Sequence, residues 1–207
     1  KLPLERAAGA RFATAVQWGR KHEFARANNL VMVLFDRALQ ARWPEEADSA
    51  KSAPALRELP EDSGWLVDIS SWQEPLPRAA AWAEYKGNRA AAGWVPDAYT
   101  AACWQAFVVQ KSPVKFKAPA GMGDGAELVV HKPSAPIAVE AVVPENTKTA
   151  TLYNGERPIA ELKLEGTNAT GTIEGLPPGV HGLSVRIARE GEPETTSTLN
   201  TILVGKE

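Results

Sequence analysis

The stretch KTATLYNGERPIAEL, residues 148–162, decides the fold of the second half of this chain. Alternating and β-branched residues stand on both sides of Asn154-Gly155. This dipeptide is preferred in the type I′ turn of a β-hairpin, because both central residues of that turn need positive φ. The stretch therefore predicts two antiparallel strands joined by a tight turn.

Short runs of the same kind fill the whole segment from 113 to 205, and Pro177, Pro178 and Gly179 mark a further turn. The predicted strands lie in VKFKAP, AELVVH, PIAVEAVV, TATLY, PIAELKLEG, TGTIEGL, HGLSVRIAR and TSTLNTILV. About seven or eight strands in a segment of this length match the size of an immunoglobulin-like β-sandwich.

The order VKFKAPAG, PIAVEAVV, KTATLYNGERPIAEL, GTIEGLPPGVHGLSVRIAR and TSTLNTILV resembles the bacterial immunoglobulin-like (Ig-like) modules of secreted enzymes. That family opens with V-x-x-x-x-P-x-x-G and continues with V-x-x-x-A-x-V and V-x-x-Y-x-G-x-x-x-I. The resemblance covers residues 113–205 and implies a sandwich fold. One departure is SVRIAREGE, where charged residues replace the usual V-x-A-x-D-x-x-G.

The first half of the chain has a different composition. All seven tryptophans lie between Trp18 and Trp104, and the Lys-Ser-Pro connector at 111–113 follows them. We expect a boundary there, with a mainly helical Trp-rich region over 1–110 and an all-β sandwich domain over 111–207. The predicted fold class is α+β and multidomain.

Three segments of the first half predict helices, and FATAVQW (12–18) predicts a buried strand. In NNLVMVLFDRALQARWP (28–44) an apolar face is formed by Val31, Leu34, Phe35 and Ala38, widened by Leu30 and Leu39, with Asn28 or Asn29 as the N-cap. PLPRAAAWAEYKGN (75–88) predicts a short helix closed by Gly87. WVPDAYTAACWQAFVV (94–109) predicts a helix capped by Asp97, with Ala101, Trp104 and Val108 on its buried face.

The segment ARFATAVQWGRKHEFARANNLVMVLFDRAL resembles the terminal strand, histidine loop and final helix of a secreted bacterial α/β-hydrolase of the esterase kind. The resemblance extends loosely over residues 10–109 and makes the region a candidate remnant of such a domain. It implies that His22 is the general base, because imidazole exchanges protons near neutral pH. His22 is equally open to interpretation as a solvated surface residue.

The sequence departs from the hydrolase pattern because no G-x-S-x-G motif occurs in it. The chain as given is therefore expected to be inactive alone, and its nucleophile would lie in an upstream catalytic segment or an associated chain. Whether it is part of an enzyme stays open.

Other candidate residues have a binding or a purely structural interpretation. Trp72, Trp82 and Trp94 are near predicted loops, where flat rings stack on sugars, although such residues more often pack in cores. Cys103 is expected to be a buried structural thiol. His131 and His181 have no Asp, Glu or Cys at ligand spacing, so neither a metal nor another cofactor is predicted.

Composition excludes some partners. A formal net charge of −2 and the absence of a basic run argue against nucleic acid, and no apolar stretch has the length of a membrane helix. No signal peptide is recognisable; the resemblance alone implies a secreted or periplasmic location. Two functions are expected to compete: the C-terminal portion of a serine esterase acting on carbohydrate or acyl esters, and a non-catalytic accessory protein whose Ig-like spacer or binding module takes polysaccharide or protein.

Overall fold

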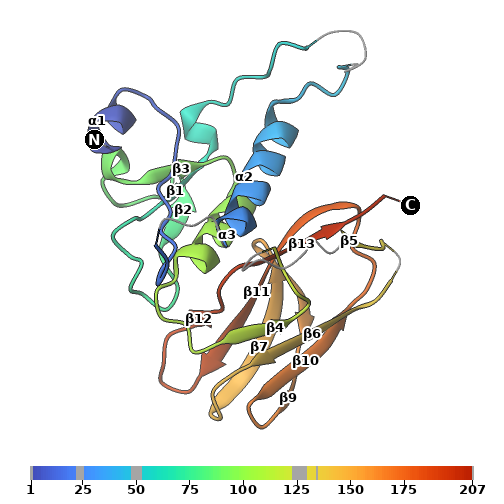
Figure 1. Ribbon diagram of the computed structural model, residues 1–207. Helices are drawn as coiled ribbons and strands as arrows, with labels where there is room; N and C mark the ends of the chain where they lie inside the picture. The colour runs from blue at the N-terminus through green and yellow to red at the C-terminus, as the bar shows by residue number, and fades with distance from the viewer. Residues whose placement is uncertain (1, 22–25, 48–52, 123–129, 134, 207) are drawn as a thin grey trace.

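The computed structural model describes residues 2–21, 26–47, 53–122, 130–133 and 135–206. Figure 1 shows two parts in contact: a mixed α/β part built from residues before 110, and a β-sandwich built from the rest. His22, the residue proposed as a general base, lies outside the described residues.

One sheet of the sandwich has four antiparallel strands in the order β4-β6-β10-β9. They are β4 (Lys115–Ala118), β6 (Ile137–Val142), β10 (Asn168–Ile173) and β9 (Lys163–Glu165). In β6 the residues alternate between buried and more exposed positions, which is the pattern of a strand with one face on a core.

The second sheet follows the order β5-β13-β11-β7-β8, and the short strand β12 pairs with β11. Its members are β5 (Val130–His131), β13 (Asn200–Val204), β11 (Gly179–Arg189), β7 (Thr147–Asn154), β8 (Arg157–Glu161) and β12 (Thr195–Thr196). The β5–β13 pair is parallel. Two mainly antiparallel sheets of this kind, with β4, β6, β10 and β9 on one side and the remaining strands on the other, form an Ig-like sandwich.

The hairpin predicted from residues 148–162 forms, but its turn is shifted by one residue. Asn154 pairs with Arg157, so the two central positions are held by Gly155 and Glu156. Gly155 has φ of 61°, a conformation that glycine adopts without strain. Asn154 is thus the last strand residue, and its side chain is free to reach the other part of the protein.

The first part contains a three-stranded antiparallel sheet, where mainly helical structure was expected. The sheet has the order β2-β1-β3, with β1 (Trp65–Val67), β2 (Ala79–Ala81) and β3 (Gly93–Val95). The described residues of this part also form the helices α1 (Leu2–Ala7), α2 (Ala27–Arg42) and α3 (Ala98–Val108) and the 3₁₀ turns η1 (Glu61–Ser63) and η2 (Arg89–Ala91).

The prediction of a helix over 75–88 is wrong. Ala79–Ala81 forms β2 because it pairs with β1 residue for residue, and backbone pairing in the tertiary structure overrides the helix preference of alanine. Gly87, the expected left-handed helix terminus, does not have positive φ.

The prediction of a buried hydrolase strand over 12–18 is also wrong. The segment is extended but belongs to no sheet, and Ala15 is exposed. Its backbone carbonyls accept isolated hydrogen bonds and not the regular ladder of a strand. The Trp94 backbone N–H donates to the Phe12 carbonyl at 2.9 Å, and the Trp104 indole donates to the Thr14 carbonyl at 2.9 Å. The neighbouring sheet is antiparallel, whereas an α/β-hydrolase has a mostly parallel sheet. The described residues of this part therefore give no support to the α/β-hydrolase resemblance.

Helix α3 matches its prediction. The Asp97 carboxylate accepts hydrogen bonds from the Thr100 backbone N–H at 2.8 Å and from the Thr100 hydroxyl at 2.7 Å. This satisfies a backbone donor that the first turn leaves without a helical partner. Ala101, Trp104 and Val108 are all buried, so α3 is the central element of the first part's core.

Helix α2 forms where expected, but its cap and its buried face differ from the prediction. The N-cap is Arg26, whose side chain makes no capping bond. Asn29 instead faces β13, where its side-chain oxygen accepts from the Thr201 backbone N–H at 2.9 Å. The residues of α2 that are buried are Asn29, Leu30 and Val33, so the helix packs on a different side from the predicted one.

The two parts share a polar and apolar junction. The Tyr99 hydroxyl donates to Asn154 Oδ1 at 2.5 Å and accepts from the Gly182 N–H at 2.8 Å. Leu199, from the sandwich, packs in the core of the first part together with α2 and α3. The main sandwich core, in contrast, contains only residues from 114 to 204. The domain division at residue 110 stays a prediction.

Candidate interaction surface on helix α2

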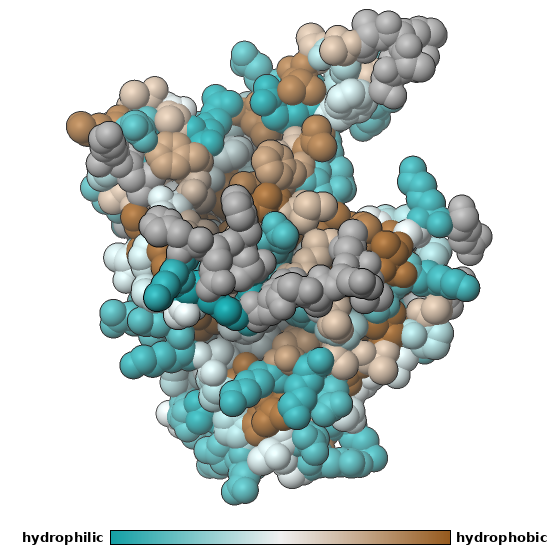
Figure 2. Space-filling view, in the orientation of Figure 1, coloured by the Kyte–Doolittle hydropathy of each residue, from teal (hydrophilic) through white to brown (hydrophobic). Residues whose placement is uncertain are grey.

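The face of α2 that sequence patterning predicted as buried is the one exposed to solvent. Phe35 is 64% exposed and Leu39 is 54% exposed, whereas Val33, which points to the other side of the helix, is 1% exposed. Val31, Met32 and Leu34 are also exposed. We call these five residues together with Ala38 the outer face of α2. Figure 2 shows apolar side chains, in brown and tan, gathered over this helix.

A groove of about 470 Å³ runs along the outer face of α2. One wall is formed by Leu34, Phe35 and Ala38, and the opposite wall by Phe12, Ala13, Leu59, Trp94 and Pro96. The volume falls within the range of roughly 300–1,000 Å³ that is typical of binding pockets. The extended segment at 12–14, misread as a hydrolase strand, is thus a wall of this groove.

Charged groups stand at the rim of the groove. Arg11 and Arg42 line it together with one carboxylate, Glu58. The Arg42 guanidinium is held in place by a hydrogen bond from Nε to the Arg57 carbonyl at 3.1 Å. Arg57 in turn donates to the carbonyls of Gln40 and Trp43 at the end of α2. We call Arg11, Arg42 and Glu58 the rim of the groove; together they add an excess of positive charge to its apolar lining.

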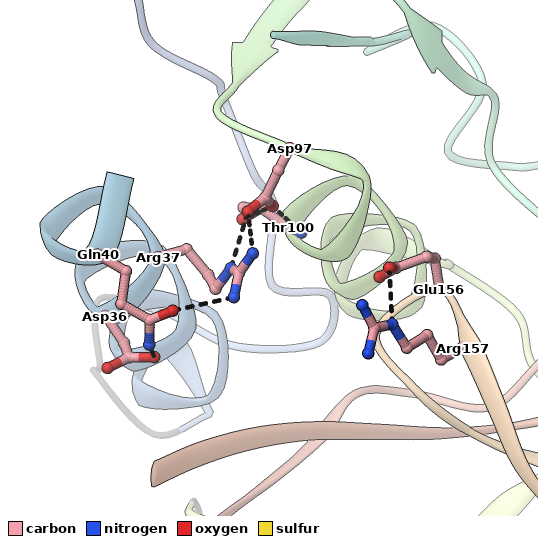
Figure 3. Close-up of polar contacts among 7 residues, drawn as sticks. All are labelled: Asp36, Arg37, Gln40, Asp97, Thr100, Glu156 and Arg157. Atoms are coloured by element: carbon pink, nitrogen blue, oxygen red, sulfur yellow. Dashed lines mark hydrogen bonds and ion pairs between the residues drawn. The ribbon is translucent and has the colours of Figure 1, made fainter. Parts of the chain in front are cut away.

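Helix α2 is anchored to the start of α3 by a polar network. Figure 3 shows Arg37 reaching from α2 to Asp97 at the start of α3. Arg37 Nε donates to Asp97 Oδ2 at 2.7 Å, and its Nη1 donates to the Gln40 side-chain oxygen at 3.0 Å. The Arg37 guanidinium also lies 5.1 Å from the centre of the Tyr99 ring. Such a network holds the helix in one orientation, so the outer face is presented as a rigid surface.

Of the three tryptophans predicted as sugar platforms, Trp82 and Trp94 share one core cluster and Trp72 lies in another. Trp94 is 7% exposed, and its indole donates to the Glu61 carbonyl at 2.8 Å. Trp72 is half-buried and packs edge-to-face on Trp18, with ring centres 5.7 Å apart. Trp82 is half-buried with the Arg89 guanidinium 4.8 Å from its ring centre. The structure does not bring the three rings together.

A second surface feature lies around Tyr85, which the sequence analysis did not single out. Tyr85 and Asp68 line two hollows of about 250 and 470 Å³. Asp68 is paired with Arg78 at 2.9 Å. Burial and the nearby Asp68 carboxylate raise the pKa of the Tyr85 phenol. The sequence could have indicated this site only through the turn residues Tyr-Lys-Gly-Asn, and such a turn is too common to identify a binding site.

The cysteine and histidine side chains that the structure describes are not gathered into a metal-binding group. No group of three His, Cys, Asp or Glu side chains is placed to hold a metal ion. Cys103 is buried, and burial raises the pKa of its thiol, so it stays protonated and is a poor nucleophile. His181 is buried between the Pro177 carbonyl at 2.7 Å and the Asn154 amide at 3.0 Å. His131 is half-buried in β5, and its Nε2 has no hydrogen-bond partner among the residues that the structure places.

No protein-family model and no curated protein matches the chain. Solved structures that resemble it include the fibronectin(III)-like modules of Clostridium thermocellum CbhA, at 19% identity over 44% of this chain and 94% of that chain, with a TM-score of 0.37. The endo-β-1,4-mannanase of Thermotoga petrophila is 12% identical over 48% of this chain and 21% of that chain, with a TM-score of 0.36.

The SGBP-B protein of a Bacteroides ovatus mixed-linkage glucan utilization locus, solved with a heptasaccharide, is 17% identical over 40% of this chain and 24% of that chain, with a TM-score of 0.24. Likenesses at this level do not show what this chain does. Among the residues that the structure places, no helix is long and apolar enough to cross a membrane.

Proposed function

We propose that this chain is a non-catalytic accessory protein that binds an associated protein chain through the groove on the outer face of α2. The observation that carries the proposal is the exposure of Phe35, Leu34 and Leu39 in one contiguous stripe beside a groove. The Ig-like sandwich acts as the rigid support, because α2 rests on β11 and β13 through Val33, Asn29 and Leu199.

A helix with apolar residues on two faces is usually covered on both. Covering a Phe or Leu side chain stabilises a complex by roughly 1.5–3 kcal/mol compared with leaving it in water. Contiguous exposed apolar patches on soluble proteins therefore mark interaction sites far more often than scattered single residues do. Leu4 and Ile159 are examples of such scattered exposed residues here.

The shape of the groove favours a peptide segment over a sugar. Aliphatic residues, with Leu34, Ala38, Leu59 and Pro96 among them, outnumber the aromatic residues in its lining. The broad indole ring of Trp94, the largest aromatic side chain in the lining, presents little surface to the groove because Trp94 is 7% exposed. A short apolar segment inserted beside a helix is a common mode of peptide recognition.

The experiment is selection from a display library of 16-residue peptides on the full chain, with counter-selection on the Phe35→Asp variant. We expect enriched peptides to bind the wild type and to lose at least tenfold in affinity for Phe35→Asp. Ile159→Asp is the matched control, because it places the same charge at an exposed apolar site on the sandwich and should leave binding unchanged. Enriched peptides that bind Phe35→Asp as tightly as the wild type would overturn the proposal.

A second candidate is binding of polysaccharide near Tyr85 and Trp82. The observation that favours it is the pair of hollows in which the Tyr85 ring adjoins Asp68 and Arg78. Aromatic rings next to planar charged groups are suited to sugar rings and hydroxyls. Of the tryptophans proposed for this role, Trp82 packs with Tyr85 and Trp94, while Trp72 lies in the other core cluster. Retardation in native gels containing β-glucan, xylan or galactomannan, lost in Tyr85→Ala, would support this candidate.

The esterase hypothesis, with His22 as base, is the weaker alternative. What supports it is a sequence resemblance only, and the neighbouring sheet is antiparallel. A secreted or periplasmic location rests on the resemblance of residues 113–205 to modules of secreted bacterial enzymes.

A further inference from the structure

Resting on the proposed function, we infer that the segment bound along α2 carries acidic residues beside its apolar core. The groove is a mixed surface, lined by apolar side chains that include Leu34, Phe35 and Ala38 and by the charged side chains of Arg11, Arg42 and Glu58. The apolar lining therefore specifies the core of the partner segment, and the charged lining specifies the residues beside that core.

The two positive charges come from different segments of the chain. Arg11 comes from the extended segment at 11–14, and Arg42 from the last turn of α2. Both are exposed. Glu58 is the single carboxylate among the lining residues. The chain as a whole has a net charge of −2. The excess of positive charge at the rim is therefore local and opposite in sign to the net charge of the chain.

Guanidinium groups form paired hydrogen bonds with carboxylates, and this planar geometry favours Asp or Glu over other anionic or polar groups. The Arg42 side chain is already oriented by its bond to the Arg57 carbonyl, so less rotamer freedom is lost when a carboxylate binds. Rim charges of this kind change association rate and specificity more than the final affinity.

Two other occupants fit the groove less well. A second copy in a two-fold arrangement would set one concave groove against another and bring two positive rims together, because such interfaces use the same patch on both subunits. A membrane surface is attracted by Arg11 and Arg42, but a flat bilayer does not fill a groove of about 470 Å³. A narrow peptide segment meets both the concave shape and the charge.

The test begins with the sequences of peptides that bind the wild type but not Phe35→Asp. We expect Asp and Glu to be enriched beside an apolar core. One consensus peptide is then synthesised with its acidic flanks and again with lysine flanks. Binding of the two peptides is measured to the wild type, to Arg11→Glu and to Arg42→Glu. Arg157→Glu is the control, because it makes the same charge change at a site that is 82% exposed on the sandwich.

For the acidic peptide, we expect association with Arg11→Glu and with Arg42→Glu to be about tenfold slower than with the wild type at low salt. For the lysine peptide, we expect these two variants to restore binding. Peptides that depend on Phe35 but show no acidic bias, and bind the rim variants normally, would overturn this inference and leave the proposed function intact. A failure to obtain any Phe35-dependent peptide would overturn the proposed function itself. Phe35-dependent binding to phosphatidylglycerol vesicles, or a Phe35-dependent dimer in sedimentation, would also overturn the inference.

Discussion

The thiol of Cys103 on α3 lies against the backbone of Gly182 on β11, with Sγ 3.9 Å from the Gly182 carbonyl oxygen. A Cβ placed on Gly182 would come within 2.4 Å of that sulfur. No side chain larger than hydrogen fits at this point without movement of the helix or the strand. The pair therefore sets how closely the first part of the protein approaches the sandwich.

Gly182→Ala is expected to destabilise the protein by about 1–3 kcal/mol, the usual cost of overpacking. Urea unfolding of the wild type, Gly182→Ala, Cys103→Ala and the double variant measures the coupling. We expect the double variant to recover much of the loss, because removing Sγ makes room for the new methyl group. Strictly additive effects would show that the two residues do not touch.

Asn29 and Asn28 are adjacent in sequence but are expected to respond differently to substitution. Asn29→Ala removes the acceptor of the buried Thr201 backbone N–H, so it should lower the free energy of unfolding by about 1–3 kcal/mol. Asn28→Ala changes an exposed residue and should stay within about 0.5 kcal/mol of the wild type. A larger loss in Asn28→Ala would restore the capping role predicted from the sequence.

The elements that sequence predicts well are those whose own residues determine them. Alternation and turn residues suffice for the sandwich, and Asp97 with its following apolar spacing suffices for α3. The prediction for Ala79–Ala81 is wrong because three alanines favour a helix, and only their pairing with β1 makes them a strand. The predicted capping role of Asn29 is wrong because the side chain bonds to Thr201, which is remote in the sequence.

The candidate site was predictable in composition but not in orientation. Helical spacing correctly grouped Val31, Leu34, Phe35 and Ala38 on one face. Whether that face or the one with Leu30 and Val33 is buried depends on which neighbours are available, and both faces are apolar. The groove also needs residues 12 and 13, whose apolar run predicted a buried strand.

Tyr99→Phe is expected to weaken the junction between the two parts. The change leaves Asn154 Oδ1 and the Gly182 N–H without the hydroxyl that both contact. Leaving such buried groups unpaired costs about 1–3 kcal/mol. Tyr153→Phe is a suitable control, because the structure gives no hydrogen bond to its hydroxyl among the residues it describes. Equal melting temperatures for Tyr99→Phe and the wild type would contradict the proposed role of the hydroxyl.

Cys103 should be almost unreactive in the folded protein. Since burial raises the pKa of its thiol, the thiolate needed for alkylation is scarce even at pH 8–9, and the reagent has no access. Iodoacetamide labelling at that pH, followed by mass spectrometry, should be at least 100-fold slower in buffer than in 8 M urea. Rapid labelling of the native chain would indicate that α3 separates from β11 in solution.

The central claim is that the outer face of α2 is a surface and not a core. Urea unfolding of Phe35→Asp, beside Val33→Asp on the other side of the helix, tests it without any partner. We expect Phe35→Asp to change the free energy of unfolding by no more than about 0.5 kcal/mol, and Val33→Asp to be severely destabilised because it buries an unpaired charge. A loss of several kcal/mol in Phe35→Asp would contradict the account, since it would place Phe35 in the folded core.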